Sequence, residues 1–180
     1  MRCPRTWTAW YNPAMKPVVL VAYDDQWPIQ FEALAHVFKT ACGSSVKAIH
    51  HVGSTSVPGL WAKPILDIDL EIDPEAFATV KAHLERLGYS HEGDLGIVGR
   101  EAFKNPQSPF PKHHLYVCVT GSAELKRHVA FRDALRKDPV LRDTYARIKR
   151  QAAFNHPLDM EGYLAEKGEW ITELYARLGV

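Results

Sequence analysis

The segment LDIDLEI, residues 66–72, alternates apolar and acidic side chains. A period of two is typical of a strand, because successive side chains point to opposite faces of a sheet. We therefore predict a strand over residues 64–72 whose apolar face enters a core. The opposite face carries Asp67, Asp69 and Glu71. This is an unusual composition, because aspartate is disfavoured in strands.

The two aspartates of this strand are candidate metal ligands. Asp67 and Asp69 stand two residues apart, or about 6.6 Å along a strand, so both can approach one small cation. Such close carboxylates repel each other unless the face is solvated or a cation neutralises it. Mg²⁺ suits the second case, because it takes one or two carboxylates and completes its shell with water and phosphate. An ordinary solvated strand face is the alternative interpretation.

A glycine- and serine-rich segment, GSTSVPG over residues 53–59, precedes the acidic strand. Backbone amides around Gly53 and Ser54, together with the hydroxyls of Ser54, Thr55 and Ser56, would form a concave anion-binding turn. A phosphate held there would lie beside a metal held by Asp67 and Asp69. Metal, phosphate turn and nearby cations are the usual parts of phosphoryl transfer, in which catalysis is mostly positioning and charge neutralisation.

Patterns along the rest of the chain predict an α/β core over about 17–120 and a helical part over about 121–180. Apolar residues at helical spacing, with proline near the start and glycine at the end, mark the helices of the core. Residues 17–22 read as a short strand or an anchoring segment. Helices are expected at about 28–42, 74–87, 122–137, 139–154 and 158–178, and further strands at 46–52, 88–92, 97–104 and 113–119.

Length and composition fit a globular protein. The chain has 180 residues, and we interpret 17–180 as a single domain. Residues 1–16 show no periodic pattern, so we interpret them as a disordered leader or a misassigned start, with Met15 as the alternative first residue. A net charge of +1 gives no strong nucleic-acid or membrane footprint. Three widely spaced cysteines favour a reducing, cytoplasmic location over a disulfide framework.

The motifs resemble a known family. Gly53-Ser54, twelve residues and then Asp67-Ile68-Asp69-Leu70 resemble the nucleotidyltransferase superfamily signature. Longer stretches resemble the GrpB family of uncharacterised UPF0157 proteins over about residues 17–178: YDDQWPIQF, HHVGSTSVPGLWAKPILDIDL, HHLYVC followed by GSAE, and FRDALRKDP. The resemblance implies a mixed β-sheet flanked by helices, with a helical C-terminal part. It also implies Mg²⁺-dependent transfer of a nucleotidyl group to an acceptor, with Mn²⁺ as an alternative metal.

One departure from the superfamily pattern concerns the strand expected beside the acidic one. A third carboxylate there commonly completes a two-metal site. HHLYVCV instead offers His114, Tyr116 and Cys118 on the corresponding face. We predict His114 as a ligand, a phosphate donor or a general base. The missing carboxylate keeps open a non-catalytic nucleotide-binding or regulatory module, since relatives are fused to dephospho-CoA kinase.

Cations and further histidines complete the candidate site. Lys63 precedes the acidic strand, Arg100 lies where the family tends to carry arginine, and Lys167 occupies an apolar position of the last helix. We predict that all three line a nucleotide site, with an unknown acceptor as second partner, and we assign Lys149 a weaker candidacy. The pairs His50-His51 and His113-His114 would supply one histidine each to a zinc phosphohydrolase site, the least favoured alternative. We expect His36, His83 and His128 to be structural or at the surface.

Overall fold

A computed structural model describes residues 17–180. The leader expected over residues 1–16 lies outside this part. The predicted acidic strand, β2, lies inside one mixed sheet in the order β1-β2-β5-β4-β3. β2 pairs in parallel with β5, while the other neighbours are antiparallel. The strands are β1 Ala48–Val52, β2 Leu66–Ile72, β3 Ser90–Gly93, β4 Arg100–Lys104 and β5 His113–Val119.

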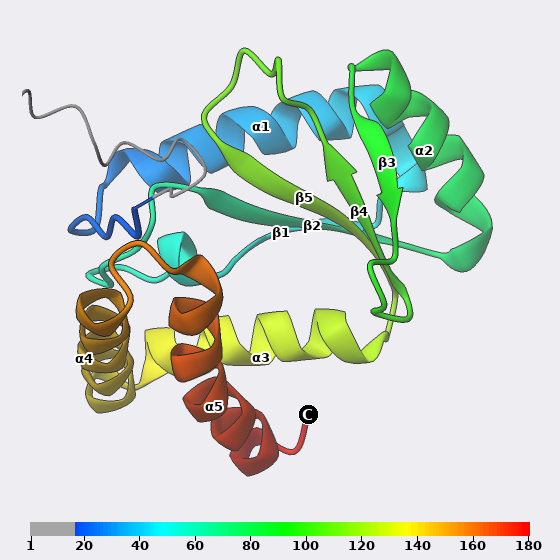
Figure 1. Ribbon diagram of the computed structural model, residues 1–180. Coiled ribbons are helices and arrows are strands. Elements are labelled where there is room, and N and C mark those ends of the chain that lie inside the picture. Colours follow the sequence, from blue (N-terminus) through cyan, green and yellow to red (C-terminus); the bar gives the residue numbers. More distant parts are fainter. Residues whose placement is uncertain (1–16) are drawn as a thin grey trace, which may run out of the picture.

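Helices cover both faces of the sheet (Figure 1). α1 and α2 lie on one face, and α3 crosses the other, with α4 and α5 packed beyond it. The helices are α1 Gln26–Cys42, α2 Phe77–Arg86, α3 Ala123–Lys137, α4 Pro139–Asn155 and α5 Met160–Leu178. This is the expected α/β architecture, with a helical C-terminal part. Throughout residues 17–180, each helix is too short or too polar to span a bilayer.

The apolar face of β2 forms the main core with α1 and α2. Ile68 and Leu70 are 0% exposed, and Leu34 and Phe38 of α1 are 0% exposed as well. The alternation of β2 supplies one half of this core. Apolar residues three or four apart on α1 supply the other half, because they fall on one stripe of the helix. Burying one face of β2 in this way leaves its acidic residues on the side of α3.

A second apolar cluster attaches the segment between β1 and β2 to the helical part. Val57 and Leu60 pack with Phe131 of α3 and Tyr145 of α4. The start of α4 is fixed by Asp138, whose carboxylate accepts hydrogen bonds from the amides of residues 140 and 141. The glycine–serine turn is therefore held between the sheet and the C-terminal helices.

The predicted order and type of the elements are confirmed, with small shifts at their ends. Residues 17–22 form no strand and make only one bridge, between Val21 and Ala62. The helix expected after Asp73 begins with a 3₁₀ turn, Pro74–Ala76. β4 begins at Arg100 rather than at residue 97, because the preceding residues form turns with positive φ at Gly96 and Gly99.

Replacing Ile68 with alanine tests the assignment of the core face. Ile68 is 0% exposed, so we expect Ile68→Ala to lower the free energy of unfolding by about 2–5 kcal/mol, because a cavity remains. Urea unfolding measures this change. Ile29→Ala is the matched control: Ile29 is 61% exposed, and its loss should change stability by less than about 0.5 kcal/mol. Equal effects would show that the face was assigned wrongly.

Candidate functional site

Asp67 stands at the entrance of the acidic face of β2. In the parallel pairing with β5 it is opposite His114. Its Oδ1 lies 2.8 Å from His114 Nδ1. The Asp67 side chain is 32% exposed and that of His114 47% exposed, so this pair is accessible to a ligand.

Gly53 lies directly against the Asp67 carboxylate. A Cβ atom at position 53 would collide with Oδ2 of Asp67, and the backbone there has φ 68°. Both observations require glycine, since other residues rarely adopt positive φ. The structure therefore brings the glycine–serine turn and the first aspartate together.

The hydroxyls of this turn point in different directions. The Thr55 hydroxyl contacts Nε2 of His51 at 3.1 Å, and the Ser56 hydroxyl donates to the Gly53 carbonyl at 2.7 Å. Both residues are almost fully buried. Two of the three hydroxyls thus have contacts inside the turn, while Ser54 and Thr55 also line the cavities described next and Ser56 does not.

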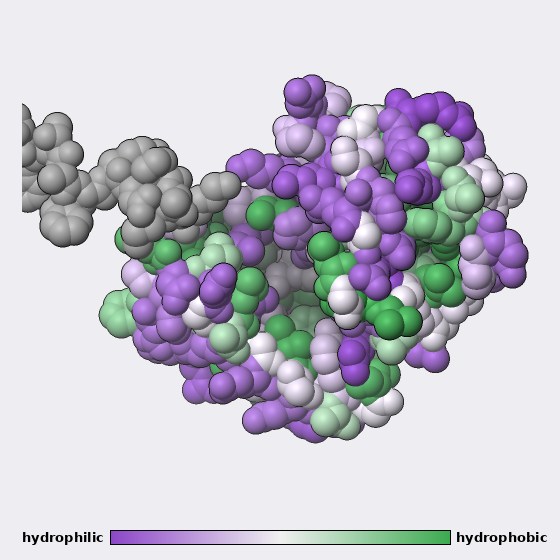
Figure 2. All heavy atoms as spheres, turned by 45° about the vertical axis from the view of Figure 1, so that its right-hand side comes forward, coloured by the Kyte–Doolittle hydropathy of each residue, from purple (hydrophilic) through white to green (hydrophobic). Residues whose placement is uncertain are grey.

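Two neighbouring cavities meet at Asp67. The first, of about 190 Å³, has aromatic residues among its lining and also contains Arg100 and His128. The second, of about 210 Å³, contains Lys63, Lys149 and Lys167. Ser54, Asp67 and Lys167 line both. Figure 2 shows that one face of the molecule is hollowed near its centre, with hydrophilic and hydrophobic residues around the hollow.

Asp69 is enclosed rather than solvated. It is 0% exposed, and its Oδ2 lies 2.7 Å from Nδ1 of His128 on α3. The interpretation of the acidic strand as a plain solvated face is therefore wrong at Asp69. Asp69 Oδ1 has no hydrogen-bond partner among residues 17–180, which is costly for a buried polar atom. Unlike Asp67, Asp69 is not among the residues that line the two cavities.

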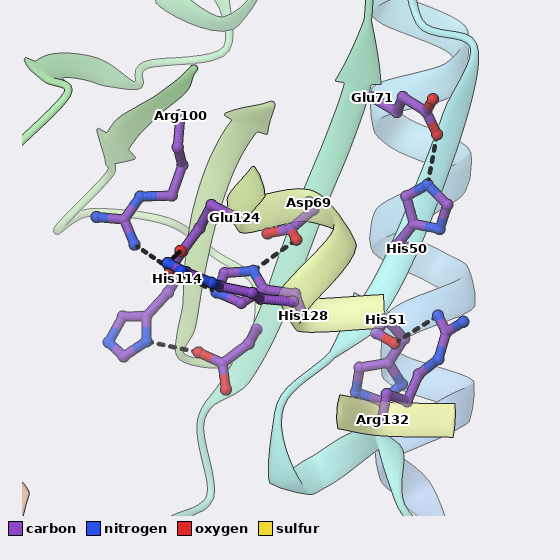
Figure 3. A network of polar contacts seen from close by, with 11 residues as sticks. His50, His51, Asp69, Glu71, Arg100, His114, Glu124, His128 and Arg132 are labelled. Carbon is purple, nitrogen blue, oxygen red and sulfur yellow. Dashed lines mark hydrogen bonds and ion pairs between the residues drawn. The ribbon is translucent and has the colours of Figure 1, made fainter. Parts of the chain in front are cut away.

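His128 continues into a chain of charges (Figure 3). Its Nε2 lies 3.2 Å from Glu124 Oε1, and Glu124 lies 3.6 Å from Arg100. The Arg100 guanidinium also stacks 4.4 Å from the centre of the Tyr116 ring. Burial lowers the pKa of His128, but hydrogen bonds to Asp69 and Glu124 outweigh it and raise the pKa to about 10. His128 is thus a cation at neutral pH.

Sequence reasoning missed the role of His128. The pattern that could have suggested it is Glu124 and His128, four residues apart on one face of α3. That pair gains meaning only once α3 crosses the acidic face. The third acid, Glu71, is satisfied elsewhere, because its carboxylate lies 2.9 Å from Nε2 of His50 (Figure 3).

The adjacent histidine pairs are split between the two faces. The ring of His51 stacks on Phe31 of α1 with centroids 4.7 Å apart, and burial lowers the pKa of His51 to about 4. His113 contacts the Tyr89 hydroxyl at 2.6 Å. Within the described residues, no three His, Cys, Asp or Glu side chains are grouped to hold a metal. Two aspartates remain as candidate ligands, and hard oxygen donors of this kind suit Mg²⁺ better than zinc.

Three lysines line the second cavity. Lys149 is 2% exposed and donates to the Trp61 carbonyl at 2.7 Å. Burial, with a contribution from Lys167, lowers the pKa of Lys149 from 10.5 to about 7. Burial and the charge of Lys63 also lower the pKa of Lys167. Lys149, given a weak candidacy above, is therefore as central to this cavity as Lys63 and Lys167.

The GrpB family model, described as GrpB protein, matches residues 17–177. The chain belongs to the GrpB family. The UPF0157 protein YqkA of Bacillus subtilis is 34% identical over 157 residues, covering 87% of this chain and 46% of that protein. A dephospho-CoA kinase of Mycolicibacterium paratuberculosis is 27% identical over 192 residues, covering 91% of this chain and 46% of the kinase. The chain thus spans about half the length of each of these relatives.

Solved structures confirm the nucleotidyltransferase-like fold. The crystal structure of GrpB from Enterococcus faecalis has a TM-score of 0.79 and 32% identity, covering 89% of this chain and 96% of that one. Cid1 in complex with its short product ApU has a TM-score of 0.51 and 9% identity, covering 73% of this chain and 42% of Cid1. The likeness to Cid1 concerns the fold alone.

His128→Leu tests whether the buried ion pair with Asp69 stabilises the fold. We expect a loss of about 3–5 kcal/mol at pH 7, because an uncompensated carboxylate remains buried. Adding Asp69→Asn to this variant should restore part of the loss. His36→Leu on the exposed face of α1 is the control and should be nearly neutral. Chemical denaturation measures the free energy of unfolding. An unchanged value in His128→Leu would contradict a stabilising ion pair between His128 and Asp69.

The lowered pKa of Lys149 predicts a pH dependence of stability. Between pH 7 and 9 the unfolded chain binds more protons at this lysine than the folded chain, because the pKa falls from 10.5 to about 7 on folding. Its contribution to unfolding free energy should therefore rise with pH, by up to about 1.4 kcal/mol per pH unit. Urea unfolding at pH 7, 8 and 9 measures the free energy of unfolding of the native chain and of Lys149→Met. The native value should rise relative to that of the variant as the pH rises, and a difference that does not change with pH would contradict the prediction.

Proposed function

We propose that this GrpB-family protein binds a nucleoside triphosphate with Mg²⁺ and transfers its nucleotidyl group to an acceptor. The observation that carries the proposal is the position of Asp67. Its carboxylate stands where a partly aromatic cavity meets a lysine-lined cavity, with Gly53 against it. A nucleotide has the same division, with a planar base at one end and a phosphate chain at the other.

The residues take their roles from this division. Aromatic rings of the first cavity, Tyr116, Phe131, Tyr145 and Tyr175, suit the nucleoside, because planar bases stack on aromatic faces. Lys63 and Lys167 of the second cavity suit the phosphates, and Ser54 lies at the junction. Arg100 lines the first cavity and is already engaged with Glu124, so we assign it to positioning that wall.

Asp67, together with Oδ1 of Asp69, would hold the metal. When bound, Mg²⁺ would neutralise phosphate oxygens and polarise the α-phosphorus. His114 would serve as general base: with Nδ1–H donated to Asp67, its Nε2 is free to accept a proton. The acceptor oxygen forms a bond to the α-phosphorus as its proton passes to His114. The bond from the α-phosphorus to the bridging oxygen breaks, and pyrophosphate leaves.

A non-catalytic nucleotide-binding module is the second candidate. Two observations favour it: β5 offers His114, Tyr116 and Cys118 beside β2 in place of a third carboxylate, and Asp69 is already bound to His128. The relative named dephospho-CoA kinase, of which this chain matches 46%, fits a module that acts beside a nucleotide enzyme. In that case a nucleotide would bind without turnover.

Asp67→Asn tests the metal role. We expect the Mg²⁺-dependent part of nucleoside triphosphate affinity to fall about tenfold or more, because the amide keeps the shape but not the charge of the carboxylate. Calorimetric titration with each of the four ribonucleoside triphosphates, with and without Mg²⁺, measures it. Asp25→Asn on an exposed carboxylate is the control. Unchanged Mg²⁺ dependence in Asp67→Asn would refute the role.

Pyrophosphate release separates the two candidates. Transfer predicts release when the protein is given the nucleotide, Mg²⁺ and a hydroxyl acceptor, with dephospho-CoA among the acceptors offered. Binding with no release across the panel would favour the regulatory module.

A further inference from the structure

The lysine-lined cavity contains more positive charge than the fold itself balances. Lys63, Lys149 and Lys167 share it with a single carboxylate, Asp67. Within residues 17–180 none of the three lysines forms a salt bridge; instead their side chains contact a carbonyl, a thioether and tyrosine rings. A buried cation without a counter-ion is costly, so this cavity suits an anion that residues 17–180 do not supply.

The three lysines come from parts of the chain that the fold brings together. Lys63 lies in the segment between the glycine–serine turn and β2, Lys149 on α4 and Lys167 on α5. Lys149 is the deepest, with its ammonium fixed by the Trp61 carbonyl at 2.7 Å and 5.4 Å from the Tyr145 ring. Lys167 lies 5.5 Å from the Tyr163 ring. These contacts hold the ammonium groups around one space and leave them donors for a ligand.

We propose that Lys149, with Lys63 and Lys167, forms a site for a polyphosphate chain, which selects a nucleoside triphosphate over a monophosphate. The inference rests on the proposed function for the identity of the nucleotide, but the anion site stands on its own geometry. Three cations exceed the charge of one phosphoryl group, and the cavity of about 210 Å³ is far larger than the ~30 Å³ share of one water molecule. The position beside Asp67 places the chain next to the metal ligand.

The charge state of Lys149 is linked to this ligand. The groups that face it are Lys167 and Lys63, which lower its pKa, and Asp67, which raises it, while burial is the largest influence. A bound polyanion outweighs the single carboxylate and favours the charged form. Binding at pH 8 should therefore draw about one proton onto Lys149, which is mostly neutral in the free protein at that pH.

Titration with inorganic tripolyphosphate, without nucleotide or metal, tests the site. We expect tripolyphosphate to bind more tightly than pyrophosphate and much more tightly than phosphate. Lys149→Met should weaken tripolyphosphate about ten- to a hundredfold, the range for one charge-assisted contact. Arg150→Met removes the same charge from the exposed face of the same helix and should change affinity less than about twofold. Lys63→Met, at a half-exposed position, should also weaken tripolyphosphate binding. If Lys149→Met does not fold, Lys63→Met alone tests whether the lysines bind the anion.

Calorimetry in two buffers of different ionisation enthalpy adds a second readout. The native chain should take up about one proton more than Lys149→Met on binding tripolyphosphate at pH 8. Equal affinity in the native chain and the lysine variants, or no binding by the native chain, would overturn the inference. Tripolyphosphate binding that depends on Lys149, in a protein that neither binds nor turns over nucleotides, would instead refute the proposed function and leave the anion site standing.

Competition distinguishes a nucleotide tail from a free polyphosphate. If the cavity receives the tail of a nucleotide, a nucleoside triphosphate displaces tripolyphosphate and the matching monophosphate does not. Displacement by neither nucleotide would overturn the selection of a triphosphate.

Discussion

Each acid on β2 is matched by a histidine from a different element, and the arrangement of the site depends on this pairing. Asp67 meets His114 of β5, Asp69 meets His128 of α3, and Glu71 meets His50 of β1. A row of like charges on one strand face would otherwise repel and oppose burial. The hydrogen bonds offset part of that cost and link β1, β5 and α3 to the central strand. The strand can therefore carry three acids under a helix.

The same pairing makes the two aspartates unequal. Asp69 is sealed beneath α3, with a protonated His128 on one oxygen and no partner from residues 17–180 on the other. Asp67 remains half-exposed at the junction of the cavities, held between His114 and Gly53. In the proposed metal site, Asp67 would therefore be the more accessible ligand, and Asp69 would contribute only its free oxygen. Such a site favours one metal held mainly by Asp67 over the symmetric two-metal arrangement that a third carboxylate would build.

Much of the fold was predictable because its information is local. The alternation over residues 66–72 fixed which face of β2 is buried, and Asp138-Pro139 marked the start of α4. Gly53 and Asp67 were linked by motif, and they meet because Val52, the residue before Gly53, pairs with Asp67 in the antiparallel ladder of β1 and β2. His128 and Lys149 were not predictable in this way. Their partners are far away in sequence, and only the packing of α3 across the sheet and of α4 against the turn gives them a role.

Among residues 17–180, the free oxygen of Asp69, the carboxylate of Asp67 and the three lysines beside Asp67 carry charges that are complementary to one ligand. The free oxygen of Asp69 and the carboxylate of Asp67 call for a cation, while the lysines of α4, α5 and the preceding segment call for an anion. Neither a metal alone nor a phosphate alone meets both needs, because each would leave the other set uncompensated. A metal-bound polyphosphate supplies both charges in one molecule. It would also join the sheet to the C-terminal helices, since the acids belong to β2 and two of the lysines to α4 and α5, so its binding would be coupled to how firmly the two halves are held together.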